Sequence, residues 1–169
     1  MRFTTAFVAA FAASAIAAPT SLSNKAHKRG VFTTQTYNDI SISGGVAGNA
    51  EAEALAVFSA LDIDNADEAD IDFLSSVNSI CNDAEEGAFN PAIDEADGEE
   101  ADALQRGKIK NKVLKLEATL LRLQIEQAQG ADVADEIAAE QKKLDNNISQ
   151  DVEAAGLPST ALEFDATTA

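Results

Sequence analysis

Histidine, cysteine and tryptophan are almost absent from this chain of 169 residues. It has one histidine, His27, one cysteine, Cys81, and no tryptophan. Catalysis by a Ser-His-Asp or Cys-His arrangement needs a histidine base, and zinc sites need several histidine or cysteine ligands. A single cysteine also excludes an internal disulfide. We therefore expect no catalytic, metal-binding or cofactor-binding residues, and a core built from regular secondary structure.

Positive charge is also scarce. The chain has 12 basic against 29 acidic residues and a formal net charge of −17. Such a surface repels nucleic acids and anionic membrane surfaces, so we expect neither as a partner. The most apolar run, residues 6–17, has about 12 residues, and a membrane span needs roughly 20. We therefore expect no membrane-spanning segment.

The first residues have the pattern of a secretory signal peptide. Arg2 precedes the apolar run, and the run ends in the small-residue sequence AIA at Ala17. This pattern predicts that residues 1–17 are a signal peptide, that cleavage follows Ala17, and that the protein is secreted.

A dibasic pair follows the predicted signal peptide. Lys28 and Arg29 lie in a small, polar segment, and kexin-type proteases of the secretory pathway cut after such pairs. We expect residues 18–29 to be a pro-segment and the mature chain to begin at Gly30. Processing would remove four basic residues and His27, which leaves eight basic against 29 acidic residues and a net charge of −21.

Residues 30–169 predict one helical domain of the mainly α class. Apolar residues recur at helical spacing in four segments, which predicts a bundle of about four helices over residues 46–60, 67–88, 99–129 and 132–155. Before them, Ile40 and Ile42 alternate with polar residues, which predicts a short extended N-terminal arm. Asn90-Pro91 predicts the end of the second helix, with Pro91 opening a short new one. The tail after Gly156 is expected to be irregular.

The third helical segment is expected to be the centre of the bundle. It carries two apolar rows, Ile109-Val113-Leu116-Leu120-Leu123 and Leu114-Leu121-Ile125, which suit packing against several helices. Gly107 is expected to weaken this helix, and Gly130 is expected to cap its C-terminal end.

Six of the 12 basic residues gather on this central segment: Arg106, Lys108, Lys110, Lys112, Lys115 and Arg122. One interpretation is that they neutralise acidic residues of neighbouring helices while their methylene stems cover apolar surface. The other is that they form an interaction stripe for an acidic partner. If the second holds, the six side chains face solvent together.

Three further features bear on metal binding, glycosylation and thiol chemistry. The acidic stretch that begins at Asp62 fails the EF-hand pattern, because position 6 is Asp67 and position 12 is Phe73. Asn147-Ile148-Ser149 is a sequon, so Asn147 is a candidate for N-glycosylation. Cys81 falls in an apolar helical row and is expected to be a buried structural thiol.

Several segments resemble those of small secreted proteins of filamentous ascomycete fungi. The segments are TYNDISISGGVAGNA, AFNPAI, EADALQRGKIKNKVLKLEATLLRLQIEQAQG and EQKKLDNNISQD, and the similarity covers residues 32–165. That family has cell-wall or effector-like members and no established activity. The resemblance implies secretion and a fungal source, and it supplies no site residues.

The sequence therefore favours a secreted, non-enzymatic protein that acts by extracellular binding and is effector-like. Its expected partner is an extracellular protein or a cell-wall component. Two alternatives stay open: a structural protein of the cell wall or cell surface, and a carrier that holds a small apolar ligand between helices.

Overall fold

A computed structural model describes residues 30–169. The predicted signal peptide with its cleavage site at Ala17, the predicted pro-segment and the dibasic pair Lys28-Arg29 all lie outside the described residues. Their assignments remain predictions from the sequence.

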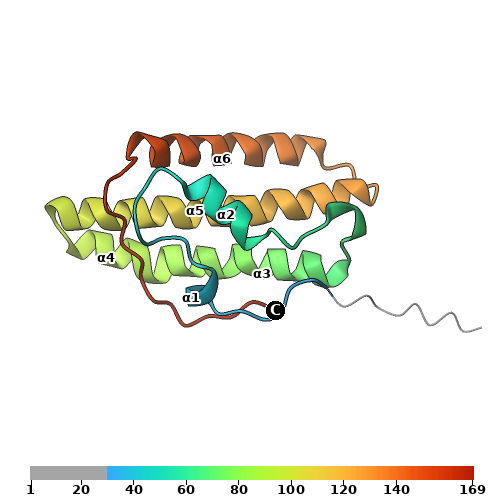
Figure 1. Cartoon of the computed structure of the whole chain (residues 1–169), viewed down its shortest axis with the longest axis horizontal. Helices are drawn as coiled ribbons and strands as arrows, with labels where there is room; N and C mark the ends of the chain where they lie inside the picture. Colours follow the sequence, from blue (N-terminus) through green and yellow to red (C-terminus); the bar gives the residue numbers. More distant parts are fainter. Residues whose placement is uncertain (1–29) are drawn as a thin grey trace, which may run out of the picture.

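The described chain is a helical bundle, which confirms the predicted fold class (Figure 1). Between residues 30 and 169 there is no strand, and four helices have eight or more residues. The elements in order are α1 (Tyr37–Ile40), α2 (Ala50–Val57), the 3-10 turn η1 (Ile63–Asn65), α3 (Glu68–Ala84), the π-helical turn η2 (Glu85–Phe89), α4 (Asn90–Glu95), α5 (Gly98–Ala128) and α6 (Ala134–Glu153).

Helix α5 is the centre of the bundle, as the sequence predicts. It packs against α3, α6 and α2. Its 31 residues contain no proline and are rich in strong helix formers. The helix is followed by Gly130, which takes a φ of 99° and donates its backbone N–H to the Gln127 carbonyl at 2.9 Å. The glycine cap is therefore confirmed.

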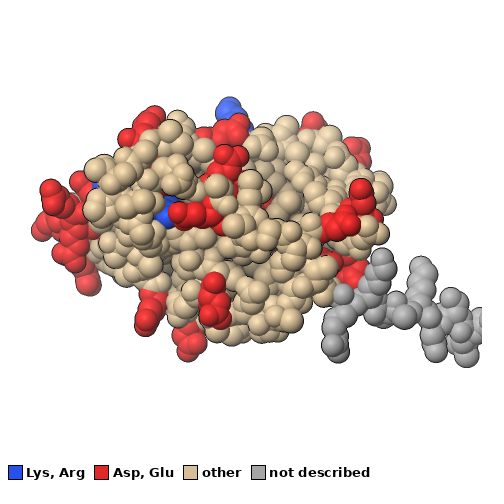
Figure 2. Space-filling view, in the orientation of Figure 1, with Lys and Arg blue, Asp and Glu red and all other residues tan. Residues whose placement is uncertain are grey.

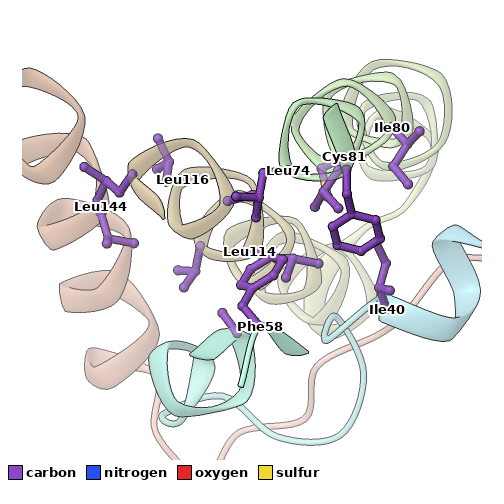
Figure 3. Packing of buried hydrophobic residues seen from close by; sticks show 14 of the residues in the cluster. Ile40, Phe58, Leu74, Ile80, Cys81, Leu114, Leu116 and Leu144 are labelled. Atoms are coloured by element: carbon purple, nitrogen blue, oxygen red, sulfur yellow. The ribbon is translucent and has the colours of Figure 1, made fainter. Parts of the chain in front are cut away.

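The hydrophobic core surrounds α5 (Figure 3). Leu114 lies with Phe58 between α5 and α2, and Leu74 and Cys81 of α3 are fully buried. Leu144 of α6 faces α5, whereas Leu116 lies on the side of α5 away from Phe58. Because each fully buried leucine or phenylalanine contributes about 1.5–3 kcal/mol, this core is the main source of stability.

The arm contains a short helix that the sequence analysis placed in extended chain. Thr36 and Asp39 form a capping box, in which the Asp39 N–H donates to the Thr36 hydroxyl and the Thr36 N–H donates to the Asp39 carboxylate. This reciprocal pair starts α1, so the strand-like alternation of Ile40 and Ile42 was misleading. Residues 30–35, before Thr36, form no helix or strand, and the chain bends at Val31.

The helical path does not end at Asn90-Pro91, so that prediction was wrong. Proline lacks an N–H, and its ring crowds the carbonyl four residues earlier. Here the Asn90 N–H donates to the carbonyl of Glu85, five residues back, and this wider π turn lets the chain continue into α4. Pro91 lies in the first turn of α4, as expected.

The C-terminal tail is irregular but firmly placed. It leaves α6 at Gly156 and crosses α5 at Gly107, where the Thr160 N–H donates to the Ala103 carbonyl at 3.0 Å. A Cβ atom on Gly107 would lie 2.0 Å from the Thr160 carbonyl oxygen. The glycine expected to weaken α5 is therefore the crossing point that the tail requires.

Beyond the crossing, the tail pairs with the N-terminal arm. Thr36 and Thr167 form an isolated antiparallel bridge, and the Thr168 N–H donates to the Gln35 carbonyl at 2.9 Å. Phe164 packs edge-on against Tyr37 with ring centroids 5.9 Å apart. The two ends of the described chain thus lie together against α3.

Candidate functional site

The six cations of the central helix do not lie together on an exposed face. All six are buried or half-buried, so the exposed interaction stripe offered as one interpretation is not present. The reason is geometric. Residues 106–122 make more than four turns of α5, so their side chains point in all directions around the helix axis. Different sides of this helix are covered by α2, α3, α6 and the tail. The cations divide into structural ones and two that line a groove.

Lys110 is the most deeply buried cation, with no side-chain exposure. Its Nζ lies 2.7 Å from Glu53 Oε2, and it donates to the carbonyls of Gly44 at 2.7 Å and Val46 at 3.2 Å. All three ammonium donors are therefore used. Because a buried charge is tolerated only when it is paired and hydrogen-bonded, Lys110 serves to hold α2 and the preceding loop on α5.

Four other cations also contact the protein itself. Lys108 and Lys115 approach Glu85 at 3.9 and 2.8 Å. The Arg106 guanidinium donates to the Pro158 carbonyl at 2.5 Å, which supports the tail crossing. Arg122 pairs with Glu126 one turn further along α5. The contacts of Lys108 and Lys115 fit the interpretation that the cations neutralise acids of neighbouring elements. Arg106 and Arg122 do not, because one contacts a carbonyl and the other an acid of its own helix.

An open groove lies over α5 between α3 and α6, with a volume of about 450 Å³. Leu116 forms part of its floor, and this residue lies on the side of α5 away from α2 (Figure 3). The lining residues are Asn78, Asn82, Lys112, Lys115, Leu116, Thr119, Glu140, Lys143, Asn146 and Asn147. Its volume falls within the usual range of ligand sites, roughly 300–1,000 Å³.

The charge of the groove contrasts with that of the whole molecule. Three lysines and one glutamate line it, a formal charge of +2, whereas the chain carries −17. Figure 2 shows acidic side chains scattered over one face of the molecule, with few basic side chains among them. A concave, positively charged site in such a protein concentrates its attraction for anions at one place.

Two of the groove lysines have carboxylate partners. Lys115 contacts Glu85, and it donates to the Asn82 carboxamide oxygen at 3.2 Å. Lys143 contacts Glu140 at 2.6 Å but keeps 60% of its side chain exposed. Lys112 has no carboxylate within 4.0 Å among residues 30–169. Lys112 is therefore the groove cation most available to a ligand.

The carboxamides of the groove add hydrogen-bonding capacity. The Asn78 amide donates to the Thr119 hydroxyl at 2.7 Å, and that hydroxyl donates to the Lys115 carbonyl at 2.9 Å. A carboxamide combines N–H donors with a carbonyl acceptor, the same kinds of group that a peptide bond carries. Asn82 already uses both kinds, with Glu86 and Lys115 as partners. Asn146 is exposed at the rim. The sequence analysis missed this site, because its residues come from three helices separated by up to 69 positions.

The candidate glycosylation site is not available in the folded protein. Asn147 is 5% exposed, and its Nδ2 atom donates to the Lys143 carbonyl at 2.8 Å. A glycan would be attached to this same nitrogen. Because the atom faces the helix and the groove wall rather than open solvent, we expect Asn147 to be unmodified.

Burial shifts the pKa of Cys81, on α3, and of Glu117, on α5. Burial raises the pKa of the Cys81 thiol to about 12, which keeps it protonated and unreactive, as expected of a structural thiol. Burial, reinforced by the nearby charge of Glu51, raises the pKa of Glu117 to about 7. Glu117 is 6% exposed and does not line the groove.

The described residues contain neither a metal-binding cluster nor a membrane-spanning helix. Within residues 30–169, no group of three or more histidine, cysteine or acidic side chains is arranged to hold a metal ion. None of the helices in this range is both long and apolar enough to cross a membrane.

Comparison with known proteins gives one match. The family model described as "Domain of unknown function (DUF8454)" matches residues 32–163, which includes every helix described above. No curated protein and no solved structure matches the chain.

Proposed function

Because the chain belongs to the DUF8454 family, a domain of unknown function, we propose its function from geometry: it is a secreted, non-enzymatic protein that binds an acidic partner outside the cell. The binding site is the groove between α3 and α6. Secretion is proposed from the N-terminal sequence, and binding is supported by the positive groove in a strongly acidic chain.

The lining of the groove favours a peptide as the ligand. Lysines at 112, 115 and 143 suit carboxylate side chains, and the surrounding carboxamides match the donors and acceptors of a peptide backbone. The lining contains no aromatic residue on which a sugar ring could stack. We therefore propose an extended acidic segment of an extracellular protein, which agrees with an effector-like role.

The same lining argues against two other functions. A carrier of an apolar ligand needs a mostly apolar cavity, whereas nine of the ten groove residues are polar or charged. A nucleophilic enzyme needs a base beside its nucleophile, and the groove residues include neither histidine nor cysteine.

A peptide-binding measurement tests the proposal. The probe is a fluorescent hexaglutamate peptide in 150 mM salt, where a screening length of about 8 Å limits repulsion by the distant acids. We expect saturable binding that weakens at least tenfold when Lys112→Glu and Lys143→Glu are combined. Lys142→Glu is the matched control, because Lys142 is an exposed neighbour on α6 that does not line the groove.

The outcomes separate the ligand classes. Binding that is equal in the groove variant and in the Lys142→Glu control would contradict the groove as the site. Binding to polygalacturonate that depends on the groove, without binding to hexaglutamate, would replace the peptide by an acidic cell-wall polysaccharide. Recovery of the protein from washed walls rather than from culture fluid would favour the structural alternative.

A further inference from the structure

The carboxylate of Asp70 is buried at the start of α3 with no basic partner in the described chain. It is 3% exposed. Its Oδ1 atom accepts the Val31 N–H at 2.7 Å, and its Oδ2 atom accepts the Asp67 N–H at 3.2 Å. Among residues 30–169, no lysine or arginine lies within 4.0 Å of it. A buried carboxylate in this state gains from a cation placed beside it.

Residue 30 lies against this carboxylate. A Cβ atom on Gly30 would be 2.9 Å from Asp70 Oδ1 and 3.0 Å from the Cβ of Ala69. Glycine is therefore the residue that fits, and its backbone approaches the carboxylate closely. The Gly30 nitrogen is one residue before the Val31 nitrogen that already donates to Asp70.

The position of residue 30 is fixed by the residues that follow it. The Phe32 ring stacks on Phe73 of α3 at a centroid distance of 4.3 Å and an interplanar angle of 11°. It also meets Phe58 of α2 edge-on at 6.4 Å. Because Phe32 is held by two helices, the chain two residues earlier is directed to the N-terminal end of α3.

The chain around Asp70 is rich in acidic residues. Six acids lie between residues 62 and 72: Asp62, Asp64, Asp67, Glu68, Asp70 and Asp72. None of the ion pairs within residues 30–169 involves any of them. A positive charge brought to this place is attracted by the whole cluster as well as by Asp70.

The sequence supplies such a charge directly before Gly30. Lys28 and Arg29 form the dibasic pair after which a processing protease would cut. We propose that cleavage between Arg29 and Gly30 creates an α-ammonium group that pairs with the Asp70 carboxylate. In the precursor the Gly30 nitrogen is an uncharged amide, so this ion pair forms only after cleavage.

The chemistry is a hydrolysis by a protease specific for dibasic sites. One water is consumed as the C–N bond between residues 29 and 30 breaks. The hydroxyl of the water bonds to the carbonyl carbon of Arg29, and its proton goes to the nitrogen of Gly30. The new carboxylic acid of Arg29 then loses its proton to become a carboxylate. The amine takes up a second proton, since α-amino groups have a pKa of about 7.7–8.0 and a nearby carboxylate raises it.

The inference is tested on the secreted full chain and on chains with defined starts. Mass spectrometry of secreted protein is expected to give the mass of residues 30–169. The chain that starts at Gly30 is then compared with one that carries two extra glycines before Gly30, which move the ammonium group away from Asp70. We expect the native start to melt about 2–4 °C higher, as a pair worth about 1 kcal/mol would do.

A charge-removing substitution identifies the partner. Asp70→Asn keeps an oxygen for the Val31 N–H but removes the negative charge, so the difference between the two starts is expected to disappear. Asp72→Asn, at an exposed neighbour on the same helix, is expected to keep it. If Asp70→Asn fails to fold, the pKa of the Gly30 amine, measured by NMR in the wild type, replaces it and is expected to exceed the pKa in the extended chain.

Three results would overturn the inference. They are a secreted chain that retains Lys28 and Arg29, equal melting temperatures for the two starts, and a difference that is unchanged in Asp70→Asn. None of these results bears on hexaglutamate binding, because Asp70 does not line the groove. A negative result here would therefore leave peptide binding at the groove untouched.

Discussion

The two sides of α5 use the same residue type in opposite ways. On the side covered by α2 and the loop before it, Lys110 has no exposed side-chain surface and uses every donor within the protein. On the other side, Lys112 borders an open groove and has no carboxylate within 4.0 Å among the described residues. Two positions along a helix amount to about 200° of rotation, so neighbouring lysines meet different environments. Composition alone therefore does not tell a structural cation from a binding one.

Replacing each lysine by methionine gives the strongest test of this contrast. Lys110→Met removes the partner of Glu53 and of two carbonyls, and we expect it to lower the free energy of unfolding by about 2–4 kcal/mol. Lys112→Met removes no such contact and is expected to change it by less than about 0.5 kcal/mol. Urea unfolding of both variants measures the difference, and equal effects would contradict the division of roles.

The tail crossing on α5 predicts the next largest effect. Gly107→Val places side-chain atoms where the Thr160 carbonyl now lies, so we expect a loss of about 2–3 kcal/mol from overpacking. Gln105→Val puts the same residue on an exposed position of the same helix and serves as the control. Limited proteolysis is expected to cut residues 157–169 earlier in Gly107→Val, and an unchanged cleavage pattern would mean that the tail can shift without being released.

The raised pKa of Glu117, which lies on α5 outside the groove, predicts that the stability of the protein depends on pH. Its folded-state pKa of about 7 lies above the unfolded value of 4.5, so the folded protein binds more protons between these pH values. This contribution to stability is therefore full below about pH 4.5 and is lost as the pH rises through 7. Glu117→Gln is expected to flatten that decline and to raise stability at pH 8 by about 1–2 kcal/mol.

Thermal unfolding between pH 4.5 and 8 measures this effect. The control is Glu163→Gln, which removes an exposed carboxylate from the tail. It is expected to keep the wild-type slope. A Glu117→Gln variant with the same slope as the wild type would show that the carboxyl titrates normally.

The smallest expected effect concerns the sequon at the groove. Ser149→Ala destroys the sequon at an exposed position without touching Asn147. Because the Asn147 amide is already bonded to the Lys143 carbonyl, we expect the wild-type protein to carry no glycan. Gel mobility and stability should therefore be the same for wild type and variant. A faster-migrating Ser149→Ala protein would show that Asn147 is modified before folding.

The sequence predicts the long helices well because their signals are local. The proline-free run that ends before Gly130 predicts residues 99–129, and the helix spans Gly98–Ala128. The predicted helix end at Asn90-Pro91 was wrong because the backbone widens into a π turn before the proline and continues as a helix. The capping box of Thr36 and Asp39 was a readable signal for α1 that the alternation of Ile40 and Ile42 concealed.

The groove and the role of Gly107 were out of reach of the sequence. Lys112 and Lys143 face one space only because α6 folds back along α5, and their separation of 31 residues carries no sign of this. Gly107 looks like a helix defect until the tail is placed across it. Features that depend on how distant segments pack are not encoded in local periodicity.

The bridge between Thr36 and Thr167 has a consequence for how the protein is made. Two segments 131 positions apart must meet, and residues 166–168 are synthesised long after residues 35–37. The backbone groups of residues 35–37 therefore lack these partners until residues 166–168 have been made, and contacts of such high sequence separation form slowly. The contacts between the arm and the tail are therefore expected to be among the last tertiary contacts to form.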